Sequence, residues 1–280
     1  AAMRRQLGVA LAIVVWFIAG MSLLVAGIVA SANVDTKTTQ IYLARAKAVA
    51  AGDGAINLAM VERRSGFERA AGGPLVSESR QRLGDVEVLV KIIPAAGFID
   101  VNNAPAEMLQ GLFHFAGGME PGDAQMVAAS VVKWRSQAAD GKSARRTRRD
   151  RGRFYSLEDM LRVDGVTRTL LDSIRDYAVA GSWINGSMDW SASPESMLDI
   201  LAALNPAQAD AMSRRRRSMA SAGPVGRMRG GGGVYRADAL VAYGGRTWLR
   251  RRWLKMESVR GSTLPWHAVR TEAPRVVGGQ

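Results

Sequence analysis

The chain has 280 residues, 48% of them hydrophobic, which is enough for one or two packed domains. Its formal net charge of +13 indicates an anionic partner or an arginine-rich surface. The absence of cysteine excludes disulfides, thiolate zinc sites and cysteine nucleophiles. His114 and His267 lie in neither a local Ser/His/Asp nor an HExxH context, so we expect no catalytic site.

An uncharged apolar segment near the start is long enough to cross a membrane. Residues 9–30 span roughly 33 Å as a helix of about 1.5 Å rise per residue. Arg4 and Arg5 precede this segment, which favours a cytoplasmic N-terminus with the rest of the chain outside. The alternative is a cleaved secretory signal ending at Ala30-Ser31-Ala32, but a signal's apolar region is usually about 7–15 residues long. We therefore expect an uncleaved single-pass anchor.

The helical pattern continues beyond the apolar segment. Steps of three and four residues separate Ile41, Ala44, Ala48, Ala51, Ala55 and Leu58. This spacing places small side chains on one face of a helix, which requires a neighbour, either a partner helix or the chain's own globular part. We expect a single helix over residues 9–66, ending at Arg63-Arg64-Ser65-Gly66. We expect its interface with a partner helix to contain Ile41, Ala44, Ala48, Ala51 and Ala55.

A short motif occurs twice. The first copy, GFIDVNNAPAEML at 97–109, recurs as a second copy, GSMDWSASPESML at 186–198. Each copy predicts a short strand followed by a helix, with Asn102 or Asn103 in the first and Ser193 in the second capping the free N–H groups. The alternating sequence DVEVLVKII before the first copy predicts a longer strand.

The middle of the chain is predicted to be helical. Residues 104–115 form one expected helix, and the apolar face of another is traced by Ala124, Val127, Val131 and Trp134. Residues 142–153 contain seven basic side chains and are interpreted as a solvated loop. Ser156 to Asp159 form a capping-box pattern, and residues 161–174 predict a helix, an Asp-Gly turn and a second helix from near Thr167.

The C-terminal part predicts a β-hairpin at 234–256. Alternating side chains approach the turn signal Gly244-Gly245, and the returning strand contains Trp248, Leu249, Trp253 and Leu254 beside three consecutive arginines. The connector before this hairpin contains an arginine run at 214–217 and a glycine run at 230–233, and is expected to be mobile.

Several of these features in chain order resemble one protein family. They are the basic leader ending in Gly8, the apolar helix that becomes amphipathic, and the block Asp100-Val101-Asn102-Asn103-Ala104 before a helix. Together they resemble the minor pseudopilin K (general secretion pathway protein K) family of type II secretion systems, which is type IV pilin-like. The resemblance implies that a prepilin peptidase cleaves between Gly8 and Val9. It also places Ile13 at the fifth mature position, where ordinary pilins carry glutamate.

The missing glutamate agrees with this particular family. In pilins, that carboxylate neutralises the terminal ammonium of an adjacent subunit inside the membrane, where an unpaired charge is costly. Pseudopilin K characteristically lacks it. The resemblance therefore implies a subunit at the tip of the assembly.

The elements and the resemblance together predict an α+β fold. A long N-terminal helix, transmembrane and then amphipathic, packs on a small antiparallel pilin-like sheet, and a large all-α domain is inserted. The expected boundaries are a leader at 1–8, the helix at 9–66, a discontinuous sheet domain at 67–103 and 223–270, the inserted domain at 104–222 and a flexible tail at 271–280.

The resemblance implies a non-enzymatic subunit at the tip of the type II secretion pseudopilus, which helps to initiate assembly for protein export across the outer membrane. Its implied partners are other minor pseudopilins, the prepilin peptidase, the inner membrane and secreted substrate proteins. The C-terminal domain is expected in the periplasm. Some members of the family bind calcium, but this sequence has no DxDxDG loop or dense acidic cluster, so we expect no metal or other cofactor.

A membrane-anchored DNA receptor of the competence type is the alternative. The run LRVDGVTRTLLDSI at 161–174 resembles a helix-hairpin-helix element, and the basic charge suits binding to phosphate. Two features argue against it. The other candidate hairpin at 115–119 is long and irregular, and a tethered DNA receptor has no need of the C-terminal hairpin. Nucleic acid is therefore not the expected partner.

Overall fold

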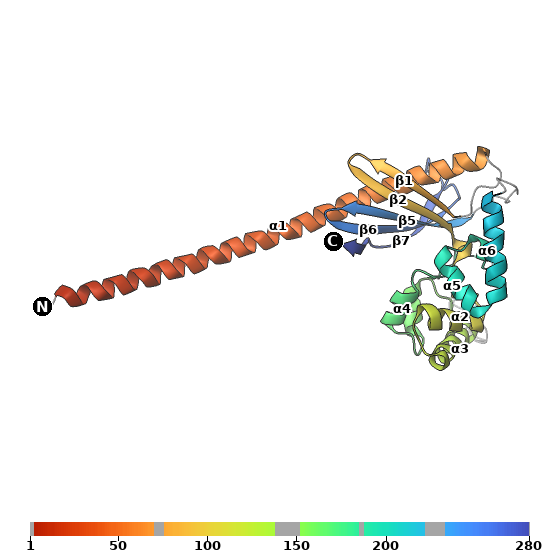
Figure 1. Ribbon diagram of the computed structural model, residues 1–280, viewed down its shortest axis with the longest axis horizontal. Coiled ribbons are helices and arrows are strands. Elements are labelled where there is room, and N and C mark those ends of the chain that lie inside the picture. The colour runs from red at the N-terminus through yellow and green to blue at the C-terminus, as the bar shows by residue number, and fades with distance from the viewer. Residues whose placement is uncertain (1–2, 70–75, 138–151, 185–187, 222–232, 280) are drawn as a thin grey trace.

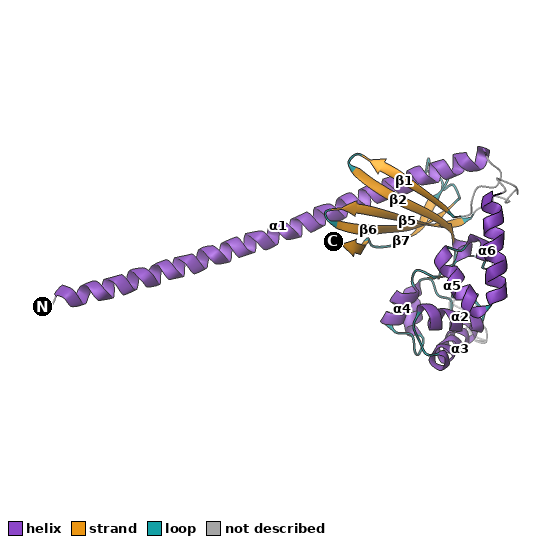
Figure 2. Cartoon of the chain, in the orientation of Figure 1, coloured by secondary structure: helices purple, strands orange, loops and turns teal. Residues whose placement is uncertain are grey.

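The computed structural model describes residues 3–69, 76–137, 152–184, 188–221 and 233–279. Figure 1 shows one long helix, a sheet lying along its C-terminal half, and a group of shorter helices beyond the sheet. Figure 2 shows that the long strands gather beside the long helix, whereas the remaining helices lie away from it. The expected α+β architecture, with a long N-terminal helix and an antiparallel sheet, is confirmed.

Helix α1 runs without interruption over Met3–Arg69. It passes the end expected at Gly66, because tertiary contacts hold its last turns. Arg63 donates from Nη1 to Ser77 Oγ at 3.0 Å, and its guanidinium lies 4.9 Å from the centre of the Tyr235 ring. Every described side chain of α1 before Ala44 is exposed, and burial begins at Ala44.

The sheet is antiparallel in the order β1-β2-β5-β6-β7, with β8 also paired to β6. Its strands are β1 (Ser77–Leu83), β2 (Val86–Pro94), β5 (Val234–Tyr243), β6 (Arg246–Lys255), β7 (His267–Thr271) and β8 (Arg275–Gly279). Three of these strands, β1, β7 and β8, lie outside the strands predicted from the sequence. The edge strand β1 has a mostly polar sequence, because an edge strand is held mainly by backbone pairing. Strand β8 lies in the segment expected to be a flexible tail and pairs with the first half of β6.

The C-terminal hairpin β5–β6 is confirmed, and its turn is Gly244-Gly245. Both glycines have positive φ, at 62° and 70°, as a two-residue hairpin turn requires. The buried face of the sheet contacts α1 through side chains of β2, β5 and β6. On the helix side this contact consists largely of alanines, whose small size allows the helix to lie close to the sheet.

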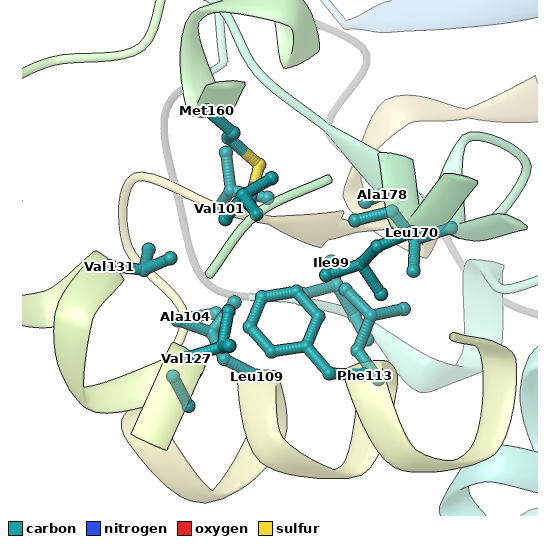
Figure 3. Close-up of a cluster of buried hydrophobic side chains, with 14 of the residues drawn as sticks. Ile99, Val101, Ala104, Leu109, Phe113, Val127, Val131, Met160, Leu170 and Ala178 are labelled. Atoms are coloured by element: carbon teal, nitrogen blue, oxygen red, sulfur yellow. The ribbon is translucent and has the colours of Figure 1, made fainter. Parts of the chain in front are cut away.

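The remaining elements form a second packed part. They are η1 (Ala95–Gly97), β3 (Ile99–Asp100), α2 (Ala106–Gly111), the π turn η2 (Leu112–Ala116), α3 (Pro121–Gln137), η3 (Leu157–Arg162), α4 (Arg168–Ile174), β4 (Ala178–Val179), η4 (Trp190–Ala192), α5 (Glu195–Leu204) and α6 (Pro206–Ser221). Their core is apolar, and Figure 3 shows Ile99, Leu109, Phe113, Val127 and Leu170 within it.

The strand after β2 belongs to this helical part. Residues up to 103 were expected in the sheet domain, but β2 ends at Pro94, and β3 pairs in parallel with β4. The reason is burial, because Ile99 and Val101 are fully enclosed in the core of the helical part. The predicted sheet boundary at residue 103 therefore lies several residues too late.

The expected helix at 104–115 is also shorter than predicted. Helix α2 ends at Gly111, and the chain continues as the π turn η2, which buries Leu112 and Phe113 together. The apolar face of α3 is confirmed, with Ala124 and Val131 fully buried. The capping box of Ser156 and Asp159 is present, although it begins the 3₁₀ helix η3. Helix α4 begins near Thr167, as expected, and the Thr167 side chain caps it.

The predicted asparagine and serine caps are wrong. Prolines 105 and 194 occupy the cap positions of α2 and α5, without a side-chain cap bond. Instead, Asp100 organises the first copy by accepting hydrogen bonds from Asn102 N and Asn103 Nδ2, at 2.9 and 2.5 Å. Asn102 binds the backbone of Phe154 through both its amide nitrogen and its amide oxygen. The short side chains therefore serve a turn and a long-range contact rather than the helix end.

Candidate functional site

The N-terminal half of α1 is an unsupported apolar rod. Helix α1 is the one helix among the described residues that is long and apolar enough to cross a membrane, and its most apolar stretch is not buried. Ile13 lies on this segment and is 64% exposed. Gly8 and Val9 fall within the described helix backbone, but their side-chain surroundings are outside the described set. Cleavage between them stays a prediction.

The alanine stripe packs against the chain's own sheet. Ala44, Ala48, Ala51 and Ala55 belong to the same buried cluster as Val88, Val90, Ala237, Ala239 and Val241. The interface prediction for these alanines is therefore corrected, because their surface is already covered within the subunit. Ile41 lies beyond the end of the sheet and is 42% exposed.

A different face of α1 is left uncovered by the sheet. We call it the outer face, and it comprises Leu43, Ala46, Ala50, Leu58 and Val61. At about 100° per residue they lie on one side of the helix, roughly opposite the mean direction of its buried residues between Ala44 and Met60. The outer face is therefore the side of α1's C-terminal half that a second helix can reach.

Ion pairs fix the position of α1 on the sheet. Asp53 accepts two hydrogen bonds from Arg250, at 2.9 and 3.0 Å, in a bidentate pair. Glu62 accepts one from Gln81 of β1 at 2.7 Å. Lys47 lies 4.9 Å from the centre of the Tyr243 ring, and its interaction with the Tyr243 hydroxyl raises the pKa of Lys47. Since a bidentate pair is directional, the Asp53–Arg250 pair fixes the position of α1 along the sheet as well as holding the two together.

A second network joins the sheet to the helical part. Its centre is Asp176, whose carboxylate accepts from Arg251 at 2.6 Å and Arg275 at 2.8 Å, while its backbone oxygen accepts from Arg236 at 2.9 Å. Arg251 also forms a bidentate pair with the buried Asp238. Burial opposes ionisation of Asp176, but Arg251 and the other guanidiniums more than offset this, and the pKa of Asp176 is lowered.

Burial also disfavours the charged form of one of these arginines, Arg236, and there the nearby carboxylates do not offset it. It lowers the pKa of Arg236 to about 10, and the guanidinium lies 4.0 Å from the centre of the Phe98 ring. On the same side of the molecule, Glu158 of η3 binds Arg270 of β7 and Arg175, each at 3.1 Å. The helical part is therefore tied to the sheet through two carboxylates and several arginines.

The two copies of the repeated motif contact one another. Asp189 N in the second copy donates to Ala96 O, just before the first copy, at 2.8 Å. A side chain at Gly97 has no room, because its Cβ would lie 2.2 Å from Ala192 O. Gly186, the equivalent of Gly97, lies outside the described residues.

An arginine from a later helix also clamps each copy. In the first, Arg135 of α3 donates to Val101 O at 2.8 Å and Ala104 O at 2.9 Å. In the second, Arg216 of α6 donates to Trp190 O and Ser193 O. The carbonyls are equivalent, since they lie one and four residues after the aspartate of their copy. Aligning the two copies of the motif did not reveal these arginines, because Arg135 and Arg216 lie outside the aligned segments.

The turn suggested as a DNA-binding hairpin is present. Gly165 has φ +88°, and Val163 and Val166 on either side of the turn are buried. The cations beside it are paired with carboxylates: Arg162 lies 3.6 Å from Asp159, and Arg168 lies 3.2 Å from Asp172. Since phosphate binding needs uncompensated cations, this surface does not favour nucleic acid. Most of the basic run at 142–153 falls outside the described residues.

The histidines have structural contacts. His114 Nδ1 lies 2.6 Å from Met119 O, and His267 Nδ1 lies 3.0 Å from Glu257 O. Among the residues that the structure describes, no group of three or more His, Cys, Asp or Glu side chains could hold a metal ion.

The chain is similar to a chain in the crystal structure of the GspK-GspI-GspJ complex of the type 2 secretion system from enterotoxigenic Escherichia coli. The identity is 11% and the TM-score 0.48, and the match covers 88% of this chain and 100% of that one. No family model and no curated protein matches.

Proposed function

We propose that this protein is a non-enzymatic minor pseudopilin of the K type, anchored in the inner membrane and assembled at the tip of a type II secretion pseudopilus. One observation carries the proposal: α1 is a continuous rod that is bare and apolar in its first half and packed on an antiparallel sheet in its second. The bare half suits storage in a membrane before assembly, and the covered half gives the subunit a rigid head.

The position at the tip rests on two further features. Ile13 places no carboxylate in the apolar segment where it could neutralise the terminal ammonium of a neighbour, and an unpaired charge there is costly. The helical part lies at the end of the molecule farthest from the N-terminus (Figure 1). A subunit stacked above it would collide with that part, so growth proceeds only below.

The outer face of α1 is the proposed contact for the other minor pseudopilins. It continues the exposed side of the apolar rod, and its alanines permit close helix approach. The alanine stripe cannot take this role, because the sheet covers it. Secreted substrate proteins are a further proposed partner, at the helical part.

The proposed leader cleavage provides the first test. Coexpression with a prepilin peptidase should remove residues 1–8 and leave Val9 N-terminal, as measured by intact mass. Gly8→Ala should be cleaved better than Gly8→Leu, because the peptidase has to accommodate the side chain before the scissile bond. A mature chain beginning at Asn33 would instead indicate a secretory signal and remove the pseudopilin proposal.

Co-purification provides the second test. The processed full chain, expressed with the other minor pseudopilins, should elute with them as a heteromeric complex. Long homopolymers of this chain alone would contradict a position at the tip.

A further inference from the structure

A groove lies between α1 and the tip of the β5–β6 hairpin. It has a volume of about 630 Å³ and is lined by Lys37, Gln40, Ile41, Leu43, Ala44, Tyr243, Gly244, Arg246 and Trp248. The hairpin touches the helix at one end of this groove, where a Cβ at Gly244 would lie 3.1 Å from that of Ala44. All the helix residues that line the groove lie at or before Ala44. The groove therefore opens on the side of the contact that faces the apolar rod, and Figure 1 shows the hairpin tip at that end of the sheet.

The lining combines an apolar wall with cationic side chains. Ile41 supplies exposed aliphatic surface, whereas Trp248 is only 5% exposed and its indole N–H is bonded to Tyr243 O at 3.3 Å. Lys37 and Arg246 supply two positive charges, and neither pairs with a carboxylate within the described part of the chain. No acidic residue lines the groove. An occupant that is anionic at one point and apolar nearby fits this chemistry.

The groove lies close to the expected membrane surface. Lys37 follows the end of the apolar segment at Ala30 by about 10 Å of helix. The headgroup layer extends about 5–8 Å beyond the hydrocarbon core on each side. A lysine side chain can extend toward that layer, and tryptophan and tyrosine are favoured at the same depth. The groove is thus placed where lipid phosphates are concentrated.

We propose that this groove binds the headgroup of an anionic phospholipid in the membrane that α1 enters. Lys37 and Arg246 bind the phosphate from two sides, while Ile41 contacts the adjoining glycerol and upper acyl carbons. The inference rests on the proposed function only in requiring that α1 is a membrane anchor. Bound lipid would hold the sheet at a fixed height above the membrane before the subunit is extracted into the assembly.

Native mass spectrometry of the full chain in detergent tests this proposal. The protein is incubated with an equimolar mixture of phosphatidylglycerol and phosphatidylcholine, and the retained lipids are counted. The wild type should retain phosphatidylglycerol preferentially. Each basic residue near an anionic surface strengthens binding to that surface about fivefold. Lys37→Gln and Arg246→Gln should therefore each reduce the preference for phosphatidylglycerol about fivefold.

Matched variants separate the groove from general attraction between charges. Arg45→Gln and Arg260→Gln remove exposed cations that do not line the groove, and both should leave the preference unchanged. Ile41→Glu should abolish the preference by placing a carboxylate in the groove. It should leave the near-ultraviolet circular dichroism unaltered, since Ile41 is partly exposed.

Three results would overturn the proposal. They are equal retention of the two lipids by the wild type, equal losses in the groove and control variants, and displacement of phosphatidylglycerol by millimolar inorganic phosphate, which would indicate a simple anion site.

Membrane fractionation separates a failure of the lipid proposal from a failure of the proposed function. A chain that leaves the membrane fraction contradicts the anchor, whereas an anchored chain without lipid preference contradicts the groove alone.

Discussion

At the residue scale, the two arginine clamps have the same task at equivalent places. Arg135 and Arg216 each donate to two backbone oxygens that lie just before the helix-starting proline of their copy. Burial is the main reason that the pKa of each is lowered, and a nearby aspartate opposes this shift in both cases. The repeat is therefore a duplicated arrangement of turn, helix and arginine, of which the turn and the helix start are visible as sequence similarity and the arginine is not.

Removing either clamp should destabilise the helical part. Arg135→Met removes the arginine donor to Val101 O and Ala104 O, and Arg216→Met removes the arginine donor to Ser193 O and one of the two donors to Trp190 O. Each change should cost about 1–3 kcal/mol in the free energy of unfolding. Urea denaturation of the full chain in detergent, followed by near-ultraviolet circular dichroism, measures this loss. Arg215→Met is the control, because Arg215 is exposed on the same helix as Arg216. A loss no larger than in the control would show that the clamps do not support the turns.

The carboxylate of Asp176 should make stability depend on pH in the acid range. Its pKa lies below the ordinary 3.8 in the folded chain, so its contribution is complete above that value and is lost as the pH falls through the lower, folded pKa. Asp176→Asn should cost about 1 kcal/mol at pH 7, since this side chain is half exposed. The difference in stability between the variant and the wild type should narrow as the pH falls below 3.8.

Denaturant titrations at pH 7, 5 and 3 would check this pH dependence. Asp172→Asn is a suitable control, because Asp172 binds only exposed or neighbouring arginines of its own helix region. A constant difference between Asp176→Asn and the wild type at all three pH values would argue against the assigned ionisation.

At the scale of elements, α1 carries two faces with different tasks. The alanine stripe holds the sheet, whereas the outer face is open. Ala48→Glu should therefore destabilise the subunit itself, by more than about 3 kcal/mol, because it places a carboxylate against buried aliphatic side chains. If Ala48→Glu fails to assemble with the other minor pseudopilins, the cause would be misfolding of the subunit rather than loss of a contact surface.

The partner interface is better tested at Ala50. Ala50→Glu lies on the exposed outer face and should change the free energy of unfolding by no more than about 0.5 kcal/mol. Co-purification with the other minor pseudopilins should nevertheless fall sharply, because the carboxylate blocks close helix approach. Arg45→Glu introduces the same group on another side of α1 and serves as the control. An intact complex with Ala50→Glu would remove the outer face as the contact.

At the scale of the whole molecule, the apolar rod and the folded head predict a single-pass topology. The chain contains no cysteine, so an introduced one is the sole thiol. Ser262→Cys in the sheet part and Ser173→Cys in the helical part are both exposed and should react with a membrane-impermeant maleimide added to intact spheroplasts. Gln6→Cys, expressed without the peptidase, should react only after lysis. Labelling of Ser173→Cys or Ser262→Cys only after lysis would reverse the proposed orientation.

The ion-pair network explains why the helical part is attached as a second body rather than on a free linker. Asp176 and Glu158 each bind arginines from the sheet, and Arg236 reaches the backbone of the helical part. A rigid junction keeps the bulky part over the end of the sheet. The proposed block to further stacking depends on that rigidity.

Local sequence patterns determine the long helix, the C-terminal hairpin and one turn of this protein. The apolar run and the alanine spacing specify α1, and strand alternation with Gly244-Gly245 specifies the β5–β6 hairpin, because both periodicities belong to neighbouring residues. The Asp-Gly turn before α4 was likewise predictable from local turn chemistry.

Tertiary structure alone decided what these elements contact. The alanine spacing marks a face that needs close packing, but a sheet and a partner helix demand the same small side chains, so the sequence does not choose between them. Strands β1 and β8 have weak patterns because edge pairing uses backbone groups that every residue carries. Arg135, Arg216 and Arg246 gained their places from folding that joins distant segments, since neither a clamp nor a groove exists until those segments meet.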